Sequence, residues 1–136
     1  MEKWEEFKSK HPKGFYVGTH KDYTFIVYQH YSSGHLNGYV ELKPQDIEFL
    51  SDKDIQELDC HGGITYQGNL NYIFKNSNKT YIGFDCNHLG DKAPFLDSLL
   101  PPQFQFSDEV WRDENFVEEN CKIIINQIVS LRKNRK

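Results

Sequence analysis

Hydrophobic and polar residues follow each other in patterns that predict short helices and strands over most of the chain. Trp4 and Phe7 lie three positions apart, as apolar residues do on one edge of a helix. Other stretches are rich in β-branched and aromatic residues, and turn residues such as Asn37 and Gly38 separate them. These patterns predict a helix at 1–9, strands at 23–31 and 39–42, one or two short helices within 44–58, a turn at 76–78 and a long irregular connection over 86–107.

Two ways of pairing the strands in the middle of the chain are open. Residues 63–67 and 80–85 both have strand patterns. If 71–75 is the middle strand of a meander between them, His61 lies at the opposite end of the sheet from Asp85, roughly 16 Å away. If 63–67 instead pairs directly with 80–85, and the residues between them form an excursion, His61 lies beside Asp85.

The clearest element is a long helix at the carboxyl end. Its apolar residues recur at helical spacing between Asp113 and about Arg132, with acidic residues at the start and basic residues at the end, as the helix dipole favours. We expect this helix to pack across one face of the sheet, and we expect the basic tail from Arg132 to Lys136 to fray. The residues of its apolar face are Val117, Cys121, Ile124, Ile125, Ile128 and Leu131.

Together these elements predict an α+β fold, with a small, mostly antiparallel sheet, a long C-terminal helix packed on one face, and short helices. At 136 residues the chain is long enough for one domain with its own core and too short for two ordinary ones. We expect a single domain over 1–136, with an N-terminal helix and link at 1–12, the sheet core with its loops at 22–107, and the long helix at 113–132.

Composition narrows the classes of function. A formal net charge of −4 argues against general nucleic-acid binding, because phosphate neutralisation needs clustered Lys and Arg. No stretch has the length of a membrane span, and the N-terminal residues lack the apolar run of a signal peptide. Three cysteines without framework spacing indicate free thiols in a reducing compartment. We therefore expect a cytoplasmic protein that has no membrane partner.

The first candidate site is the tripeptide His61-Gly62-Gly63, which leads directly into a predicted strand. Paired glycines permit positive φ angles and a close backbone approach, so their N–H groups can cradle an oxyanion. The alternative is a tight turn followed by a structural histidine. The tripeptide resembles part of an esterase oxyanion loop, but the chain has no Gly-x-Ser-x-Gly nucleophile elbow, so that enzyme class is not supported.

The second candidate site is the loop after the strand at 80–85. Asp85, His88 and Asp91 can ligate a divalent metal, or His88 can act as an acid–base group tuned by a carboxylate. Alternatively, Asp85 and Asn87 bond to backbone N–H groups and shape the loop.

The segments at 61–66 and 83–91 carry a resemblance to a known family. His61-Gly62-Gly63-Ile64-Thr65-Tyr66 and Gly83-Phe84-Asp85-Cys86-Asn87-His88-Leu89-Gly90-Asp91 resemble the signature of small uncharacterised phage and bacterial proteins, and 37–40 and 111–119 are similar to that family too. The resemblance covers about 37–131. It implies a phage or mobile-element protein, carries no activity, and favours direct pairing of the strands at 63–67 and 80–85. A zinc site on Cys60 and Cys86 departs from the family pattern.

These observations lead first to a ligand-binding hypothesis. The protein would be a phage or mobile-element protein, for example an anti-defence factor, that binds a nucleotide-like or phosphorylated ligand. The two glycines would hold a phosphate, Tyr66 or Tyr81 would stack on a base, and His88 or Arg112 would add positive charge. The expected ligand-binding residues are His61, Gly62, Gly63, Thr65, Tyr66, Asp85, Asn87, His88, Asp91 and Arg112.

Two alternatives belong to other classes of protein. One is a metal-dependent phosphoester hydrolase with His61 and His88 as catalytic candidates and with Asp85, His88 and Asp91 as candidate metal ligands. The other is an inhibitor that binds a host protein through an acidic surface with Glu114, Glu118 and Glu119.

Overall fold

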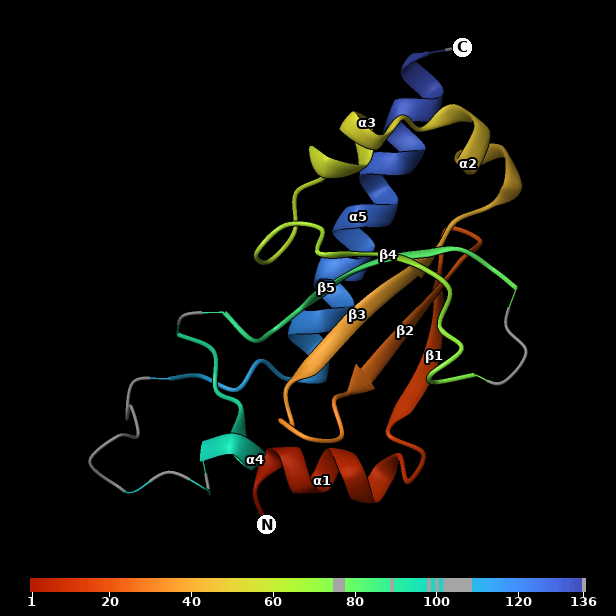
Figure 1. The fold of residues 1–136 in the computed structure, drawn as a ribbon. Coiled ribbons are helices and arrows are strands. Elements are labelled where there is room, and N and C mark those ends of the chain that lie inside the picture. Colours follow the sequence, from red (N-terminus) through yellow and green to blue (C-terminus); the bar gives the residue numbers. More distant parts are fainter. Residues whose placement is uncertain (75–77, 89, 98, 100, 102–108, 136) are drawn as a thin grey trace.

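The computed structural model describes residues 1–74, 78–88, 90–97, 99, 101 and 109–135. It has the expected α+β fold, built on a five-stranded antiparallel sheet of order β1-β2-β3-β5-β4 (Figure 1). The strands are β1 (Phe15–His20), β2 (Tyr23–Gln29), β3 (Leu36–Glu41), β4 (Tyr66–Gly68) and β5 (Tyr81–Asp85). The helices are α1 (Lys3–Lys10), α2 (Pro44–Phe49), α3 (Asp52–Gln56), α4 (Pro94–Asp97) and α5 (Glu114–Asn134).

The long helix α5 covers one face of the sheet and packs on β2 and β3 (Figure 1). Asp113 caps it by accepting a hydrogen bond from the Phe116 N–H at 3.0 Å, which satisfies one of the free N–H groups of the first turn. The predicted apolar face is confirmed, since its residues from Val117 to Ile128 are buried in the main core. Gly38 permits this close packing, because a Cβ there would lie 2.6 Å from the Phe84 ring and 2.9 Å from Cys121 Sγ.

The opposite face of the sheet carries a second, smaller core. It is built mainly from tyrosines and isoleucines, and the segment after β4 supplies Leu70 to cover it. Each central strand therefore has two buried faces, which explains why β2 and β3 consist almost entirely of buried residues. The buried members of this second core are Ile26, Tyr28, Tyr39, Leu70 and Tyr81.

The structure settles the strand pairing in favour of the direct arrangement. β4 pairs antiparallel with β5, and the Thr65 N–H extends the ladder by donating to the Gly83 carbonyl at 2.9 Å. Residues 71–74 form a turn and not a strand of a meander. In the predicted turn at 76–78, residues 76 and 77 lie outside the described residues, as do 89, 98, 100 and 102–107 of the predicted irregular connection, whose described part contains α4.

Three differences from the sequence predictions have physical reasons. β1 was not predicted, because on this edge strand the side chains are only half-buried or exposed and give no clear alternation. β3 begins at Leu36 and not at 39, because Asn37 and Gly38 are held by cross-strand pairing with β5. The basic tail is held in place up to Arg135 and is not frayed there, because the Arg135 guanidinium donates two hydrogen bonds to Asp54, at 2.7 and 2.8 Å. Among the described helices, none is long and apolar enough to cross a membrane.

Candidate functional site

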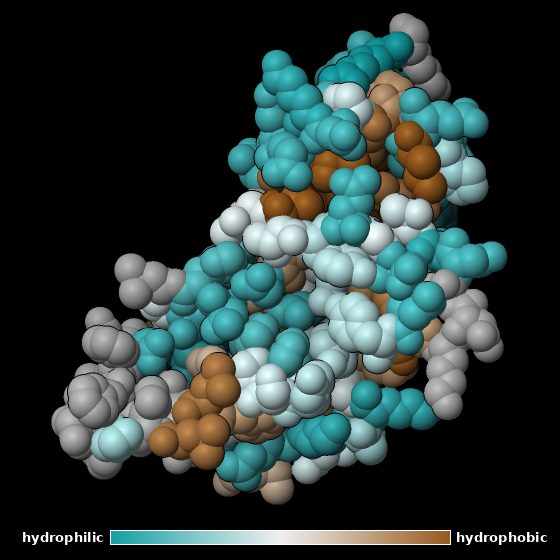
Figure 2. All heavy atoms as spheres, in the orientation of Figure 1, coloured by the Kyte–Doolittle hydropathy of each residue, from teal (hydrophilic) through white to brown (hydrophobic). Residues whose placement is uncertain are grey.

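The pairing of β4 with β5 brings the two sequence motifs into contact. The His61 and His88 rings lie 5.5 Å apart, edge to face. Gly62 has a φ of +71°, and a Cβ there would lie 2.1 Å from His88 Nε2, so the His88 imidazole rests directly on the glycine backbone. Hydrophilic residues dominate the surface over the end of β5 and the loop that follows (Figure 2). The motifs therefore form one site.

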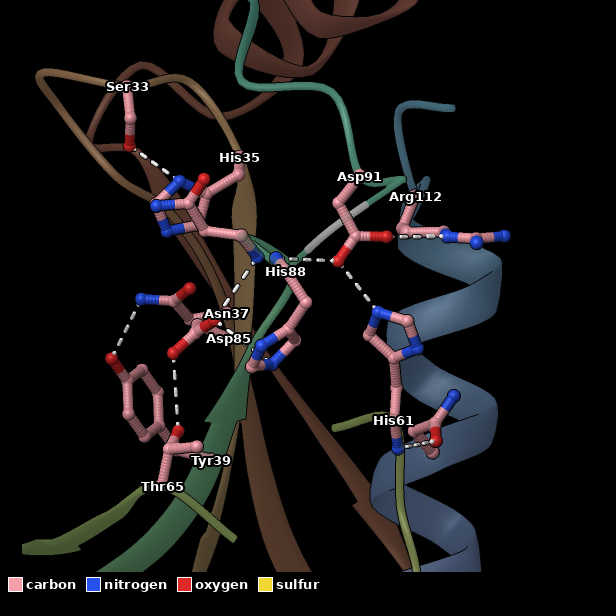
Figure 3. Close-up of polar contacts among 12 residues, drawn as sticks. Ser33, His35, Asn37, Tyr39, His61, Thr65, Asp85, His88, Asp91 and Arg112 are labelled. Carbon is pink, nitrogen blue, oxygen red and sulfur yellow. Dashed lines mark hydrogen bonds and ion pairs between the residues drawn. The ribbon is translucent and has the colours of Figure 1, made fainter. Parts of the chain in front are cut away.

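A buried carboxylate, Asp91, fixes the geometry of this site. Its Oδ2 lies 2.7 Å from His61 Nε2 and accepts the His88 N–H at 3.1 Å, and its Oδ1 accepts Arg112 Nε–H at 2.9 Å (Figure 3). Burial by itself raises the pKa of Asp91, but these three hydrogen bonds outweigh burial, so the pKa lies below its ordinary value of 3.8. We call His61, Asp91 and Arg112 the Asp91 network.

His61 is held from both sides and lies against α5. Its backbone N–H donates to Asn120 Oδ1 at 2.8 Å, and its ring stands edge-to-face on Phe116 at 5.0 Å. Arg112 in turn lies over the same Phe116 ring, at 5.0 Å. These contacts join the glycine turn, the loop after β5 and the start of α5. The arrangement identifies His61 and Asp91 chiefly as positioning residues, which favours the structural interpretation of His61.

A second group of polar side chains lies where β3 starts and β5 ends, beside His88. We call Asn37, Tyr39, Thr65, Asp85 and His88 the sheet-end cluster (Figure 3). Asn37 and Asp85 are cross-strand partners and therefore project from the same face of the sheet. Asp85 Oδ2 accepts a hydrogen bond from the Thr65 hydroxyl at 3.3 Å. The Asn87 N–H donates to Asp85 Oδ1 at 3.1 Å, so Asp85 also shapes the loop, as one alternative predicted.

Two buried polar atoms of the sheet-end cluster have no hydrogen-bond partner in the described structure, Asn37 Oδ1 and His88 Nε2. His88 Nε2 lies 3.2 Å from Asp85 Oδ1, which is within ion-pair distance, but the two groups do not form a hydrogen bond. Asn37 is 7% exposed and uses its Nδ2 to donate to the Tyr39 hydroxyl at 3.1 Å. The Tyr39 hydroxyl also contacts that of Tyr72.

Sequence reasoning missed His35, Asn37 and Tyr39. His35 is buried next to the cluster, with Nδ1 2.5 Å from Ser33 Oγ. Burial and the neighbouring His30 lower the pKa of His35 from 6.5 to about 4, although the carboxylates of Asp85 and Asp91 and the nearby Asn37 side chain act in the opposite direction. The available sequence signal was the alternation of polar residues at 33, 35 and 37, which places them on one side of an extended chain.

The predicted phosphate cradle is only partly available. Gly62 and Gly63 both have positive φ, +71° and +78°, as the paired glycines permit. However, the Gly63 N–H already donates to the Cys60 carbonyl at 3.0 Å, which leaves at most the Gly62 N–H for a ligand. Of the two tyrosines predicted to stack on a base, Tyr81 is buried in the second core and is unsuitable, whereas Tyr66 is half-buried.

The predicted metal ligands do not form a suitable donor set. Both oxygens of Asp91 are occupied by His61, Arg112 and a backbone N–H, which leaves only Asp85 and His88 of the three candidates. Over the described part of the chain, no three His, Cys, Asp or Glu side chains gather in a way that could hold a metal ion. The buried Cys86 does not change this result. The geometry therefore gives no support to a metal-dependent hydrolase.

No protein-family profile, characterised protein or solved structure matches this chain. The function must therefore be argued from the site itself.

Proposed function

We propose that the protein binds a small, nucleotide-like phosphorylated ligand at the sheet-end cluster and the adjoining Asp91 network. The observation that carries this proposal is a pair of buried polar atoms, Asn37 Oδ1 and His88 Nε2, that have no hydrogen-bond partner among the described residues. Leaving a buried polar atom unsatisfied costs roughly 1–3 kcal/mol, so such atoms are rare in folded proteins, and polar groups of a ligand can satisfy them.

The surroundings of these atoms fit a ligand that is partly polar and partly aromatic. The side chains of Asp85 and His88 are each 33% exposed, so this part of the sheet-end cluster is open to solvent beside the buried atoms. Tyr66 and Tyr72 stand edge-to-face at 6.4 Å and supply aromatic surface beside the polar groups. Among the described residues, Arg112 bonds to Asp91 through Nε alone, which leaves its two terminal nitrogens for an anionic group.

Binding is better supported than catalysis because His61 is committed to the structure. His61 Nε2 is bonded to Asp91 and its ring packs on Phe116, while no metal donor set accompanies His88 among the described residues. A protein of this kind acts by sequestering its ligand. We propose such a role for it as a phage or mobile-element anti-defence factor directed at a nucleotide-derived signal.

Calorimetric titration of the purified protein with mono-, di- and cyclic nucleotides tests the binding proposal. At least one nucleotide should bind with a defined stoichiometry, and His88→Ala should abolish that binding. His20→Ala is the matched control, because this histidine lies at the end of β1, the opposite edge strand from β4. Lack of binding by every nucleotide would overturn the proposal and favour the alternative of a host-protein inhibitor.

Asn37→Leu separates a ligand site from a structural role. Leucine fills a similar volume and removes the unsatisfied oxygen, so the urea midpoint should stay equal or rise. Nucleotide binding should nevertheless be lost. A large loss of stability together with unchanged binding would show that Asn37 serves the fold alone.

A further inference from the structure

We infer that the sheet-end cluster holds the nucleoside part of the ligand through neighbouring O–H or N–H donors, with the phosphate on the Arg112 side. This inference rests on the proposed binding of a nucleotide-like ligand and specifies how that ligand lies in the site. The shared chemistry is a pair of hydrogen-bond donors, which either a ribose diol or an amino-substituted base can supply.

The groups of the cluster are mostly acceptors. Asp85 provides a carboxylate, and Asn37 presents Oδ1, because its Nδ2 already donates to the Tyr39 hydroxyl. A phosphate placed here would bring a second negative charge next to Asp85, and close like charges disfavour binding. Neutral donors on the ligand satisfy the same atoms without that repulsion. A carboxylate that receives sugar hydroxyls is a common arrangement in nucleotide sites.

Asp85 is already oriented for this role. The Asn87 N–H holds Oδ1 and the Thr65 hydroxyl holds Oδ2, so the carboxylate has little freedom to lose when a ligand binds. Each oxygen has two lone pairs, and one donor occupies each oxygen, so both can accept a further hydrogen bond. Asn37 lies directly across from Asp85 in the β3–β5 register, which places the two side chains on the same face of the sheet.

The charges of the site favour a position for the phosphate at the Arg112 end, opposite the sheet-end cluster. His88 links the two ends, because its N–H donates to Asp91 while its Nε2 lies next to Asp85. Beyond Asp91 stands Arg112, the cation of this arrangement, with its side chain 31% exposed. Figure 3 shows the cluster on one side of His88 and Asp91, and Arg112 on the other side with its guanidinium directed away from the cluster, so a ligand that extends past His88 from the cluster approaches the positive charge at Arg112.

The test compares three forms of whichever ribonucleotide binds, using titration calorimetry. These are the ribonucleotide, its 2′-deoxy form, and the form whose exocyclic amine is replaced by a carbonyl. Removal of the contacted donor should weaken binding at least tenfold in one of the two altered forms, which also tells whether ribose or base occupies the cluster. The full chain is used throughout.

Asp85→Asn should reduce that discrimination to less than threefold, because the amide offers one acceptor oxygen in place of two while still receiving the Asn87 N–H. Asp59→Asn is the matched control, since Asp59 is exposed and its hydrogen bonds with Gln127 are made by its backbone N–H and carbonyl. Equal affinity for all three forms, with no effect of Asp85→Asn, would overturn this inference and leave the proposed binding function intact. Absence of any nucleotide binding would overturn both.

Discussion

At the residue scale, Gly62 connects backbone conformation with the position of His88. Gly62 and Gly63 both have positive φ, so alanine strains the backbone at either position by about 1 kcal/mol. They differ in surroundings, because a Cβ on Gly62 would lie 2.1 Å from His88 Nε2 whereas one on Gly63 meets nothing within 4 Å. Gly62→Ala should therefore displace His88 and abolish nucleotide binding.

Gly63→Ala is the matched control for that change. It should lower the free energy of unfolding by a similar backbone contribution and keep the ligand affinity within about threefold of the wild type, a difference of less than 1 kcal/mol. Urea denaturation and calorimetry measure the two quantities separately. Equal loss of affinity in both variants would show that the turn as a whole, and not the His88 contact, controls the site.

His35 makes stability depend on pH. Its pKa is about 4 in the folded protein and 6.5 ordinarily, so the unfolded chain binds more protons between these values. The stability that neutral His35 allows is complete above pH 6.5 and is lost as the pH falls toward 4. By pH 5 the loss should reach about 2 kcal/mol.

The His35 contribution is measured by urea denaturation at pH 7 and pH 5 in the wild type and in His35→Gln. The variant should be less stable at pH 7, because it loses the contact with Ser33, but its stability should fall less between the two pH values. An identical fall in both proteins would show that other groups cause the acid sensitivity.

At the element scale, α5 supplies most of the attachment between helix and sheet. Ile124 is fully buried in the main core, whereas its neighbour Ile123 is 42% exposed. Ile124→Ala should lower the free energy of unfolding by about 2–4 kcal/mol, because it leaves a cavity under the sheet. Ile123→Ala should cost less than about 1 kcal/mol, and chemical denaturation of both variants checks the prediction. Similar losses would contradict the assigned face of the helix.

The elements also differ in how well they can be predicted from the amino-acid sequence. α5 was predicted within about two residues at its end, because six apolar residues at helical spacing give a strong local signal. β1 was missed, because an edge strand with one paired neighbour shows little alternation in its sequence. Asn37 and Gly38 were interpreted as a turn, since their tendency toward turns is local while their pairing with β5 is not.

At the scale of the whole molecule, Asp91 joins segments that are distant in the sequence. Its carboxylate is bonded to His61 before β4, to the loop at His88, and to Arg112 before α5. Asp91→Asn should lower the free energy of unfolding by about 3 kcal/mol, because it leaves a half-buried guanidinium without its anion. In the wild type, the stability that the negative charge of Asp91 contributes is present above pH 3.8 and is lost as the pH falls below that value.

Denaturation of Asp91→Asn and of the control Asp59→Asn at pH 7 tests this contribution. The first variant should also show faster amide hydrogen exchange in the glycine turn, because that turn loses its connection to α5. If both variants are as stable as the wild type, Asp91 does not join the three segments energetically.

The α+β class, the long C-terminal helix, the two short helices after β3 and the two motifs could be predicted from the amino-acid sequence, because all of these arise from local spacing and residue type. Long-range contacts fix which residues of the motifs are committed to the fold. His61 and Asp91 became positioning residues through contacts with Arg112 and Asn120 that lie far away in the sequence. Tertiary structure also brought Asn37 opposite Asp85. Hydrogen-bond partners across a sheet depend on which strands become neighbours, and β3 and β5 are too far apart in the sequence for a local pattern to specify their pairing.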